Sequence, residues 1–344
     1  MNRKFIDLFA GIGGFRMGFE NNGFECVFSS EKNKYCQEVY KDNFGEEPYG
    51  DITKIAPKDI PDFDLLLGGF PCQPFSISGK KLGFDDTRGT LFFNVCQIIQ
   101  EKKPKVVVLE NVKHLIHHDK KRTLTVILNS LKELGYNVSH QVLNSKDFGL
   151  PQNRERIFII GCKNSFFDFN KLQKSPTPQL ENFLDKKNSF EFLDKSEYTL
   201  IDNPKKQPAG LIFVGYRNKN QWKKGVRPNT SHLSRVHRQP NRIYSVEGVH
   251  PTIPSQETSG RFFIYLPKMD MVRKLTLDEC YRIMGFPSSF KRHSKTGEQY
   301  KQIGNSVAVS VIDAIAKQIL EQNLLNDEPQ TEIIGNLQAL LHNN

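Results

Sequence analysis

Short apolar runs alternate with longer amphipathic stretches over the first 162 residues. The short runs predict strands, and they occupy residues 4–9, 25–30, 64–69, 105–110, 137–144 and 156–161. Amphipathic stretches between them predict helices, notably at 88–103 and at 121–135, where Gly135 marks the end. Strands that alternate with helices favour a sheet covered on both faces. We therefore predict an α/β fold with a Rossmann-like, doubly wound mixed sheet.

The alternating pattern breaks down between residues 165 and 270, where Pro, Asn, Lys and Ser are frequent. This composition predicts a smaller domain of short strands and long loops. Beyond it, residues 275–286 read as a short amphipathic helix and residues 306–322 as a long one. The long helix is too apolar to stand alone, so we expect it to return to the first domain. The smaller domain would then be an insertion.

These patterns define a domain division with two functional parts. We predict that residues 1–165 and 300–326 form a catalytic and cofactor-binding domain, and that residues 166–272 form a smaller domain of mostly β structure and loops. Residues 273–299 would connect the two, and residues 327–344 would form a C-terminal tail. No apolar run is long enough to span a bilayer. An early acid, Asp7, argues against a signal peptide. We expect a cytoplasmic protein without a membrane partner.

The net charge of +10 across 344 residues favours a polyanionic partner without identifying one. Basic residues gather between Arg217 and Arg242, a stretch with almost no acids. Trp222, His232 and His237 interleave with these charges. Such a stretch is either a solvated loop or a surface that contacts phosphates, and the interleaved rings favour the second interpretation.

Six cysteines are scattered without a C-x-x-C pair, which argues against both a zinc site and a disulfide framework. Most should be buried thiols in a reducing compartment, and we expect no metal. Cys72 differs because it stands between two prolines, directly after the predicted strand 64–69. Ligands bind beyond the carboxyl ends of such strands. Cys72 is therefore either a nucleophile or a small residue that fills a turn.

A glycine turn follows the first predicted strand, in the sequence DLFAGIGG from Asp7 to Gly14. Backbone N–H groups at the start of a helix can receive a ligand there, although a glycine turn alone is a weak signal. Glu31 lies twenty residues beyond Gly11, at the end of the second predicted strand, and Asp51 follows the next connection. An acid at that place is suited to hydrogen-bond ribose hydroxyls. The combination indicates a nucleoside-containing cofactor.

More polar side chains reach the same predicted edge. Glu110 and Asn111 end the strand 105–110, and Arg154 and Arg156 stand two apart at the start of another strand. Residues two apart on a strand share a face. Separately, Glu110 could cap a helix and the arginines could pair with Glu155. Together, a thiol, a carboxyl and two guanidiniums would converge beside the cofactor.

Several motifs occur in a fixed order: FAGIGG, PCQ, ENV, QNRER and a late GNSV. In this, the chain resembles the DNA (cytosine-5) methyltransferase family, in particular its single-chain bacterial modification methylases. The resemblance covers nearly all of residues 1–162 and again about 273–318. It implies an S-adenosylmethionine-dependent methyltransferase fold, with residues 166–272 as the target-recognition domain.

The resemblance also implies the catalytic groups. Cys72 would attack C6 of a cytosine swung out of the duplex, because cytosine C5 alone is a poor nucleophile. Glu110 would hold or protonate N3, and Arg156 would contact O2. Arg154 would support the DNA backbone or the closed catalytic loop.

The cofactor implied by the resemblance is S-adenosyl-L-methionine. Phe9 would lie against the adenine, Glu31 would bind the ribose, and Asp51 with Ile52 would meet the adenine edge. Lys32 departs from the aromatic residue of a close relative, so we expect modestly altered affinity. The full expected set is Phe9, Gly11, Ile12, Gly13, Gly14, Glu31, Lys32, Asp51, Ile52, Gly69, Pro71 and Asn305.

The substrate implied is double-stranded DNA carrying a short specific site, with a palindrome as the family expectation. Residues 76–89 would form a mobile lid. Ser76 would contact a phosphate, and Ser78 and Gln239 would occupy the space that the flipped base leaves. Arg242 and Thr252 match recurrent anchor points of the target-recognition region.

Three alternatives remain open. An RNA (tRNA) cytosine-5 methyltransferase of the same family shares the core motifs, although the long basic insert favours duplex DNA. A catalytically silent DNA-binding regulator and a nicotinamide-dependent oxidoreductase are further possibilities. We expect a monomer near the bacterial nucleoid, the modification half of a restriction-modification system. A cognate restriction endonuclease would act on the same site without direct contact.

Overall fold

A computed structural model describes residues 3–71, 90–186, 190–204, 206–218, 241–256 and 262–326. The chain divides into two compact units. The first comprises residues 1–143, 155–173 and 311–344, and the second comprises 144–154 and 174–310. This division gives the segment 273–310 to the second unit, whereas the sequence division treats 273–299 as a connector and 300–326 as catalytic. The functional division of the chain stays a prediction.

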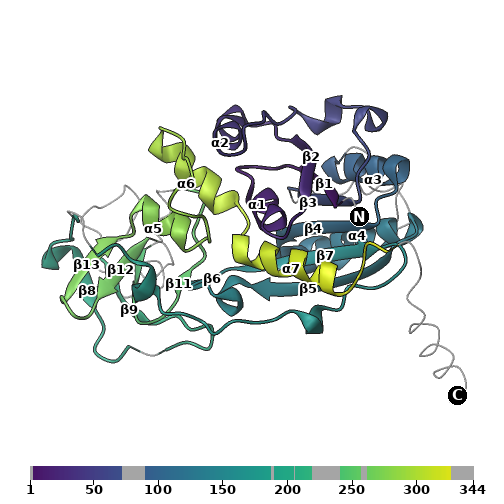
Figure 1. The fold of residues 1–344 in the computed structure, drawn as a ribbon. Coiled ribbons are helices and arrows are strands. Elements are labelled where there is room, and N and C mark those ends of the chain that lie inside the picture. Colours follow the sequence, from purple (N-terminus) through teal and green to yellow (C-terminus); the bar gives the residue numbers. More distant parts are fainter. Residues whose placement is uncertain are drawn as a thin grey trace, which may run out of the picture. The chain divides into compact units, whose positions relative to one another are not determined.

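A six-stranded sheet forms the centre of the first unit (Figure 1). Its strands are β1 (Lys4–Leu8), β2 (Glu25–Ser30), β3 (Leu65–Gly69), β4 (Val106–Val112), β5 (Asn137–Asn144) and β7 (Glu155–Cys162). They lie in the order β2-β1-β3-β4-β7-β5. The pairs β1–β2, β1–β3 and β3–β4 are parallel, whereas β4–β7 is antiparallel. The predicted mixed, doubly wound sheet is confirmed.

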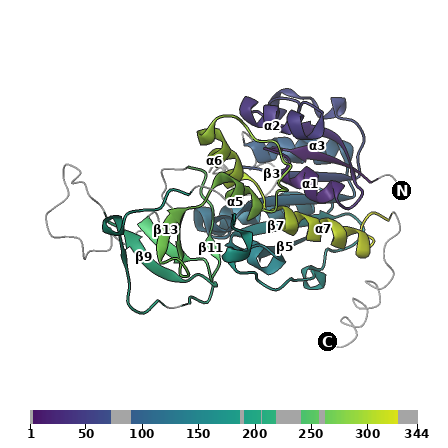
Figure 2. The ribbon, with the colours of Figure 1, turned by 60° about the vertical axis from the view of Figure 1, so that its left-hand side comes forward.

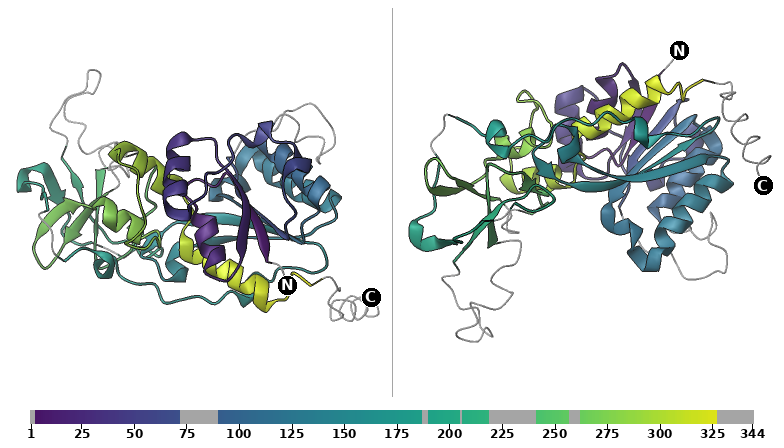
Figure 3. Two further views of the ribbon diagram at one scale, coloured as in Figure 1. Left: turned by 45° about the horizontal axis from the view of Figure 1, so that its top comes forward. Right: turned by 90° about the horizontal axis from the view of Figure 1, so that it is seen from below.

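Helices cover both faces of this sheet (Figure 3). They are α1 (Gly14–Glu20), α2 (Lys34–Phe44), α3 (Leu91–Lys102), α4 (Arg122–Glu133) and α7 (Val309–Glu321). On the α3–α4 face, alternate strand residues such as Ile6, Leu66 and Val107 join one buried apolar cluster. On the other face, α7 packs against α1: a Cβ atom at Gly18 would come within 2.7 Å of Ile312. The long C-terminal helix therefore returns to the first unit, as predicted.

The second unit contains a sheet that includes β9 and β13 (Figure 2). This sheet has five strands in the order β13-β12-β10-β9-β8. Its strands are β8 (Tyr198–Leu200), β9 (Phe213–Arg217), β10 (Arg242–Ser245), β12 (Phe263–Leu266) and β13 (Met271–Lys274). A separate parallel pair joins β6 (Gln152–Asn153) and β11 (His250–Pro251). The helices of this unit are α5 (Leu277–Arg282) and α6 (Thr296–Asn305). The short strands and loops agree with the pattern predicted for the smaller domain.

Short 3₁₀ helices complete the connections. They are η1 (Ile52–Lys54), η2 (Pro57–Asp59), η4 (Lys113–Ile116), η5 (His118–Lys121), η6 (Ser145–Phe148), η7 (Phe169–Lys171), η8 (Leu180–Phe183) and η9 (Lys195–Glu197).

A buried ion pair anchors α5 in the second unit. Arg273 donates to both carboxylate oxygens of Glu279 at 2.8 and 2.7 Å, and these side chains are 2% and 0% exposed. Glu279 also accepts the backbone N–H groups of Thr276 and Asp185. The Thr276 hydroxyl accepts the backbone N–H of Glu279 and completes a capping box at the start of α5. The Arg273 guanidinium lies 4.1 Å from the centre of the Phe190 ring.

Among the described residues, one helical segment, Thr296–Glu321, is long and apolar enough to cross a membrane, with a mean hydropathy of 1.3. It consists of α6 and α7 with a non-helical break between them. Because 61% of its apolar window is buried within the protein, the segment is typical of a core helix.

Candidate active site

The glycine turn after β1 has the backbone shape that its sequence predicts. Gly11 and Gly13 have φ values of 56° and 85°, which glycine adopts without strain. Gly13 must also lack a side chain, because a Cβ atom there would lie 2.1 Å from Phe44. Phe9 has φ 57° although it is aromatic, a conformation that costs energy and is typical of functional sites. The turn thus places Phe9 at the carboxyl edge of the sheet.

Glu31 is held against this turn at the end of β2. Its Oε2 accepts the backbone N–H of Gly11 at 2.8 Å, and its Oε1 accepts the N–H of Asn33 at 2.7 Å. The carboxylate therefore joins the glycine turn to the start of α2, where the Asn33 side chain caps the helix.

Asp51 stands at the start of η1 and is fixed by three interactions. One carboxylate oxygen accepts the Thr53 backbone N–H at 3.1 Å and the Thr53 hydroxyl at 2.8 Å. The other oxygen pairs with Lys32 at 2.9 Å. Hydrogen bonds from Lys32 and then Thr53 lower the pKa of Asp51 to about 2, so it is a carboxylate at neutral pH.

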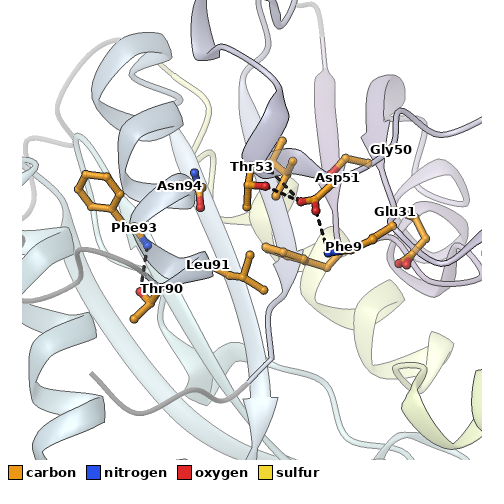
Figure 4. A pocket seen from close by; sticks show the side chains of 12 residues that line it. Phe9, Glu31, Gly50, Asp51, Thr53, Thr90, Leu91, Phe93 and Asn94 are labelled. Atoms are coloured by element: carbon orange, nitrogen blue, oxygen red, sulfur yellow. Dashed lines mark hydrogen bonds and ion pairs between the residues drawn. The ribbon is translucent and has the colours of Figure 1, made fainter. Parts of the chain in front are cut away.

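These residues line a pocket of about 510 Å³ in the first unit (Figure 4). Five of its residues belong to the predicted cofactor set: Phe9, Glu31, Lys32, Asp51 and Ile52. The opposite side comes from the start of α3, where Leu91 and Asn94 are seen across from Asp51 and Glu31 (Figure 4). Sequence reasoning missed the other lining residues: Ser30, Gly50, Thr53, Thr90, Leu91, Phe93 and Asn94.

The sequence did carry one signal for the missed wall. Thr90 precedes the apolar run of α3, and its side chain accepts the backbone N–H of Phe93 as an N-cap. A helix that begins at Thr90 has Leu91, Phe93 and Asn94 in its first turn, and these are three of the missed residues.

The remaining predicted cofactor residues do not line this pocket. Ile12 is buried, with 1% exposure. Gly11, Gly13 and Gly14 belong to the glycine turn that leads into α1. Gly69 ends β3, where a Cβ atom would approach Glu110 Oε2 to 3.3 Å, and the exposed Pro71 follows. Asn305 ends α6 and is exposed in the second unit.

Glu110 and Arg156 meet at the carboxyl end of β4. The distance between Arg156 Nε and Glu110 Oε1 is 3.1 Å, and the two side chains are 16% and 12% exposed. Arg156 also donates to the carbonyl of Glu155 at 2.8 Å. Burial lowers the pKa of Arg156, and the Glu110 carboxylate opposes that effect. Next to them, Asn111 donates to the carbonyl of Phe70 at 2.8 Å, which fixes the chain just before Cys72.

Arg154 does not share a strand face with Arg156, which corrects the sequence prediction. The strand β7 begins at Glu155, so Arg154 precedes it, in the connection from β6. The Arg154 side chain is 2% exposed, and Nη2 donates to the carbonyls of Gly304 and Ser306 within the second unit. Spacing alone suggested a shared face because it assumed an uninterrupted strand.

Several predicted DNA and catalytic residues lie outside the described residues, namely Cys72, Ser76, Ser78 and Gln239, together with Trp222, His232 and His237. The two remaining predicted DNA-binding residues, Arg242 and Thr252, are described. Arg242 begins β10, and its guanidinium carbon lies 5.3 Å from the centre of the Phe213 ring. The Thr252 hydroxyl donates to the carbonyl of Asn153 at 2.8 Å.

The thiols of four described cysteines are buried and unsuited to nucleophilic attack. Burial raises the pKa of Cys26 and of Cys162 to about 12, and it also raises the pKa of Cys96 and of Cys280. These four therefore stay protonated at neutral pH. Cys36 is half-buried on α2. Within the described ranges, no group of three or more His, Cys, Asp or Glu residues could hold a metal ion.

Comparison with known proteins identifies the family of the chain. Residues 3–321 match the family model for C-5 cytosine-specific DNA methylase. The type II methyltransferase M.HhaI of Haemophilus parahaemolyticus is 44% identical over 322 residues, which cover 92% of this chain and 94% of that protein. The type II methyltransferase M.HaeII of Haemophilus aegyptius is 45% identical over 324 residues, 94% of each chain.

The fold has solved counterparts. The crystal structure of the S. pombe Dnmt2 methyltransferase matches with a TM-score of 0.65 at 18% identity, covering 93% of this chain and 99% of that one. The predicted methyltransferase fold is thereby confirmed. The chain belongs to the C-5 cytosine-specific DNA methylase family and is an enzyme that methylates cytosine in DNA at C5.

Proposed function

We propose that the protein takes its methyl group from S-adenosyl-L-methionine bound in the first-unit pocket and that Cys72 is the attacking nucleophile. The observation that carries this proposal is the meeting of Phe9, Glu31 and Asp51 in one pocket. That pocket and the Glu110–Arg156 pair both belong to the carboxyl edge of the sheet in the first unit, where doubly wound folds bind ligands.

The lining residues fit this cofactor. A pocket of about 510 Å³ lies within the usual range for small-molecule sites. Glu31 would bind the ribose hydroxyls, since a carboxylate accepts two hydroxyl donors. Phe9 would pack on the adenine ring, and Asp51 with Ile52 would meet the adenine edge. When bound, the cofactor supplies a methyl group activated on a sulfonium.

The chain's own residues would prepare the cytosine. The Cys72 thiolate would form a bond to C6, which moves electron density to C5 and makes it nucleophilic. Glu110 would hold or protonate N3, and Arg156 would contact O2, so both favour addition at C6. After C5 gains its methyl group and loses its proton, the S–C6 bond breaks and the thiolate is restored.

The duplex hides C6 and C5, so the target cytosine must be extruded. Residues 76–89 would close over the DNA, with Ser76 on a phosphate and Ser78 and Gln239 in the vacated space. Arg242 and Thr252 would belong to the target-recognition region. Arg154, held by the carbonyls of Gly304 and Ser306, would support the loops near the DNA.

The relatives named type II methyltransferases support a proposal for the biological setting. We infer a monomer that modifies a short palindromic DNA site in the bacterial cytoplasm, at the nucleoid. A cognate restriction endonuclease would recognise the same site without touching this protein.

A covalent trap tests the nucleophile. DNA with 5-fluorocytosine at the target cannot lose a proton from C5, so wild-type protein and cofactor should form a stable adduct on a denaturing gel. Cys72→Ala should abolish the adduct and methyl transfer, whereas the matched Cys36→Ala variant should keep both. Adduct formation by Cys72→Ala would refute the assignment. Preferential labelling of tRNA over DNA would instead favour the RNA methyltransferase.

A further inference from the structure

Arg16 is an almost fully buried cation that is not one of the residues lining the pocket. It lies on α1 just after the glycine turn, and its side chain is 7% exposed. Nε pairs with Glu20 at 2.7 Å, and Nη1 pairs with Glu46 at 2.9 Å. The same Nη1 reaches the Tyr40 hydroxyl at 3.5 Å. Arg16 thus connects α1 to the end of α2 and to the turn after it.

The guanidinium also packs on aromatic rings at that end of α2. Its carbon lies 4.6 Å from the centre of the Phe44 ring and 5.4 Å from that of the Tyr40 ring. Phe44 in turn fills the space beside Gly13, where a Cβ atom would come within 2.1 Å. A planar, permanently charged group can stack on rings and hold carboxylates at once, which lysine cannot do. Arg16 therefore holds Phe44 against the glycine turn.

The other end of α2 is attached to Glu31. The N–H of Asn33 donates to Glu31 Oε1 at 2.7 Å, and the Asn33 side chain caps the helix through the N–H groups of Tyr35 and Cys36. Glu31 Oε2 accepts the N–H of Gly11. One helix, α2, therefore connects the Glu31 carboxylate at its start with the glycine turn at its end. The contact of Glu31 with Asn33 and that of Phe44 with Gly13 together fix the position of the carboxylate.

Stability alone is a weak reason for this arrangement. The carboxylate partners Glu20 and Glu46 are 34% and 60% exposed, so their ion pairs with Arg16 contribute little to stability. An apolar side chain of similar volume often stabilises a protein as well as or better than a buried charge. A rigid fork that fixes two helices is, by contrast, an effective way to preorganise a binding group.

We propose that Arg16 is a positioning residue for the methyl donor, fixing through Phe44 and α2 the placement of the Glu31 carboxylate relative to the glycine turn. This inference rests on the proposed role of Glu31 in ribose binding. It extends the site to a residue of α1 that does not line the pocket.

Cofactor binding by calorimetry tests the proposal, with S-adenosylmethionine and its 2′-deoxyribose analogue as probes. Arg16→Lys keeps the charge but loses the fork, so Kd should rise about tenfold, while kcat at saturating cofactor stays within about twofold. The preference for ribose over deoxyribose should shrink. Glu46→Gln, at an exposed partner, should raise Kd about threefold. Arg282→Lys, which alters a 2.7 Å pair with Asp185 in the second unit, should leave Kd unchanged.

A double variant separates positioning from general structural support. If Arg16 acts through Glu31, then Arg16→Lys should add little to the loss already caused by Glu31→Gln. Unchanged Kd and ribose preference in Arg16→Lys, or fully additive losses in the double variant, would overturn the inference. If Arg16→Lys does not fold, the Kd of Glu46→Gln decides in the same way. Normal binding by Glu31→Gln would instead overturn the proposed function.

Discussion

The two units each bury an Arg–Glu pair, and the two pairs are built differently. In the second unit, Arg273 and Glu279 form a two-pronged contact, are 2% and 0% exposed, and Glu279 accepts two backbone N–H groups besides. In the first unit, Arg156 Nε lies 3.1 Å from Glu110 Oε1, and the two side chains are 16% and 12% exposed. Both pairs have the same chemistry, but they differ in their exposure to solvent.

We expect that difference to separate a structural pair from a functional one. Glu279 accepts four donors and is shielded from solvent, so it has no capacity left for a ligand. Glu110 lies beside Gly69 at the edge of the sheet and still touches solvent, so a ligand can reach it. Access of solvent to the carboxylate is therefore the feature that we expect to mark the functional pair.

The largest expected effect is on stability. Arg273→Met leaves the Glu279 charge buried without its partner and should lower the free energy of unfolding by about 3–5 kcal/mol. The matched Arg156→Met should lower it much less, because Glu110 can still reach water. Urea denaturation followed by circular dichroism measures both. Equal losses at the two positions would remove the distinction drawn between the pairs.

The next effect is on rate. Glu110→Gln keeps the size and an oxygen for Arg156 but cannot deliver a proton, so methyl transfer should slow about a hundredfold, or about 2.7 kcal/mol. Radioactive methyl transfer to DNA at saturating cofactor measures this. Glu155→Gln, which alters a neighbouring acid paired with Lys113, should stay within about twofold. A rate near that of the wild type for Glu110→Gln would show that the Glu110–Arg156 pair is not catalytic.

The third effect is a pH dependence of stability, spread over several pH units, that comes from another buried group. Asp7 is fully buried on β1, and burial raises the pKa of its carboxyl to about 8, with Arg16 opposing. The unfolded chain releases this proton near pH 4. Between pH 4 and pH 8 the folded state therefore holds a proton that the unfolded state lacks, and stability falls as pH rises, by up to about 1.4 kcal/mol per pH unit.

Asp7→Asn isolates this contribution, because all other titrating groups are shared with the wild type. The variant should gain stability relative to the wild type from pH 5 to pH 8, and the gain should level off above pH 8. Urea denaturation across that range gives the difference. Parallel pH profiles for the two proteins would mean that Asp7 is already ionised in the folded state.

Much of the first unit could be predicted because its signals are local. Each of the six strands begins or ends within two residues of an apolar run, and Glu31 comes directly after such a run. A parallel arrangement brings strand ends to one edge, so chain position was enough to bring Phe9 and Glu31 together.

The missed features depend on tertiary packing. Leu91 and Asn94 reach the pocket only because α3 packs on the sheet, and no periodicity states where a helix will dock. Arg154 was misplaced because a two-residue strand and a break precede β7, and neither leaves a mark in the apolar pattern. The Arg16 contacts join three segments whose spacing in the sequence carries no common motif.

The return of α7 to the first unit has a consequence for synthesis. The chain segments that line the pocket, from Phe9 to Asn94, leave the ribosome long before Val309–Glu321, the helix that packs on Gly18 and hydrogen-bonds Asn22 through Asp313. Until that helix emerges, one flank of α1 lacks its cover, and the nascent protein cannot complete the packing of its first unit. We therefore expect methyl transfer to require the chain through α7, and a translation product that stops before Val309 to lack it.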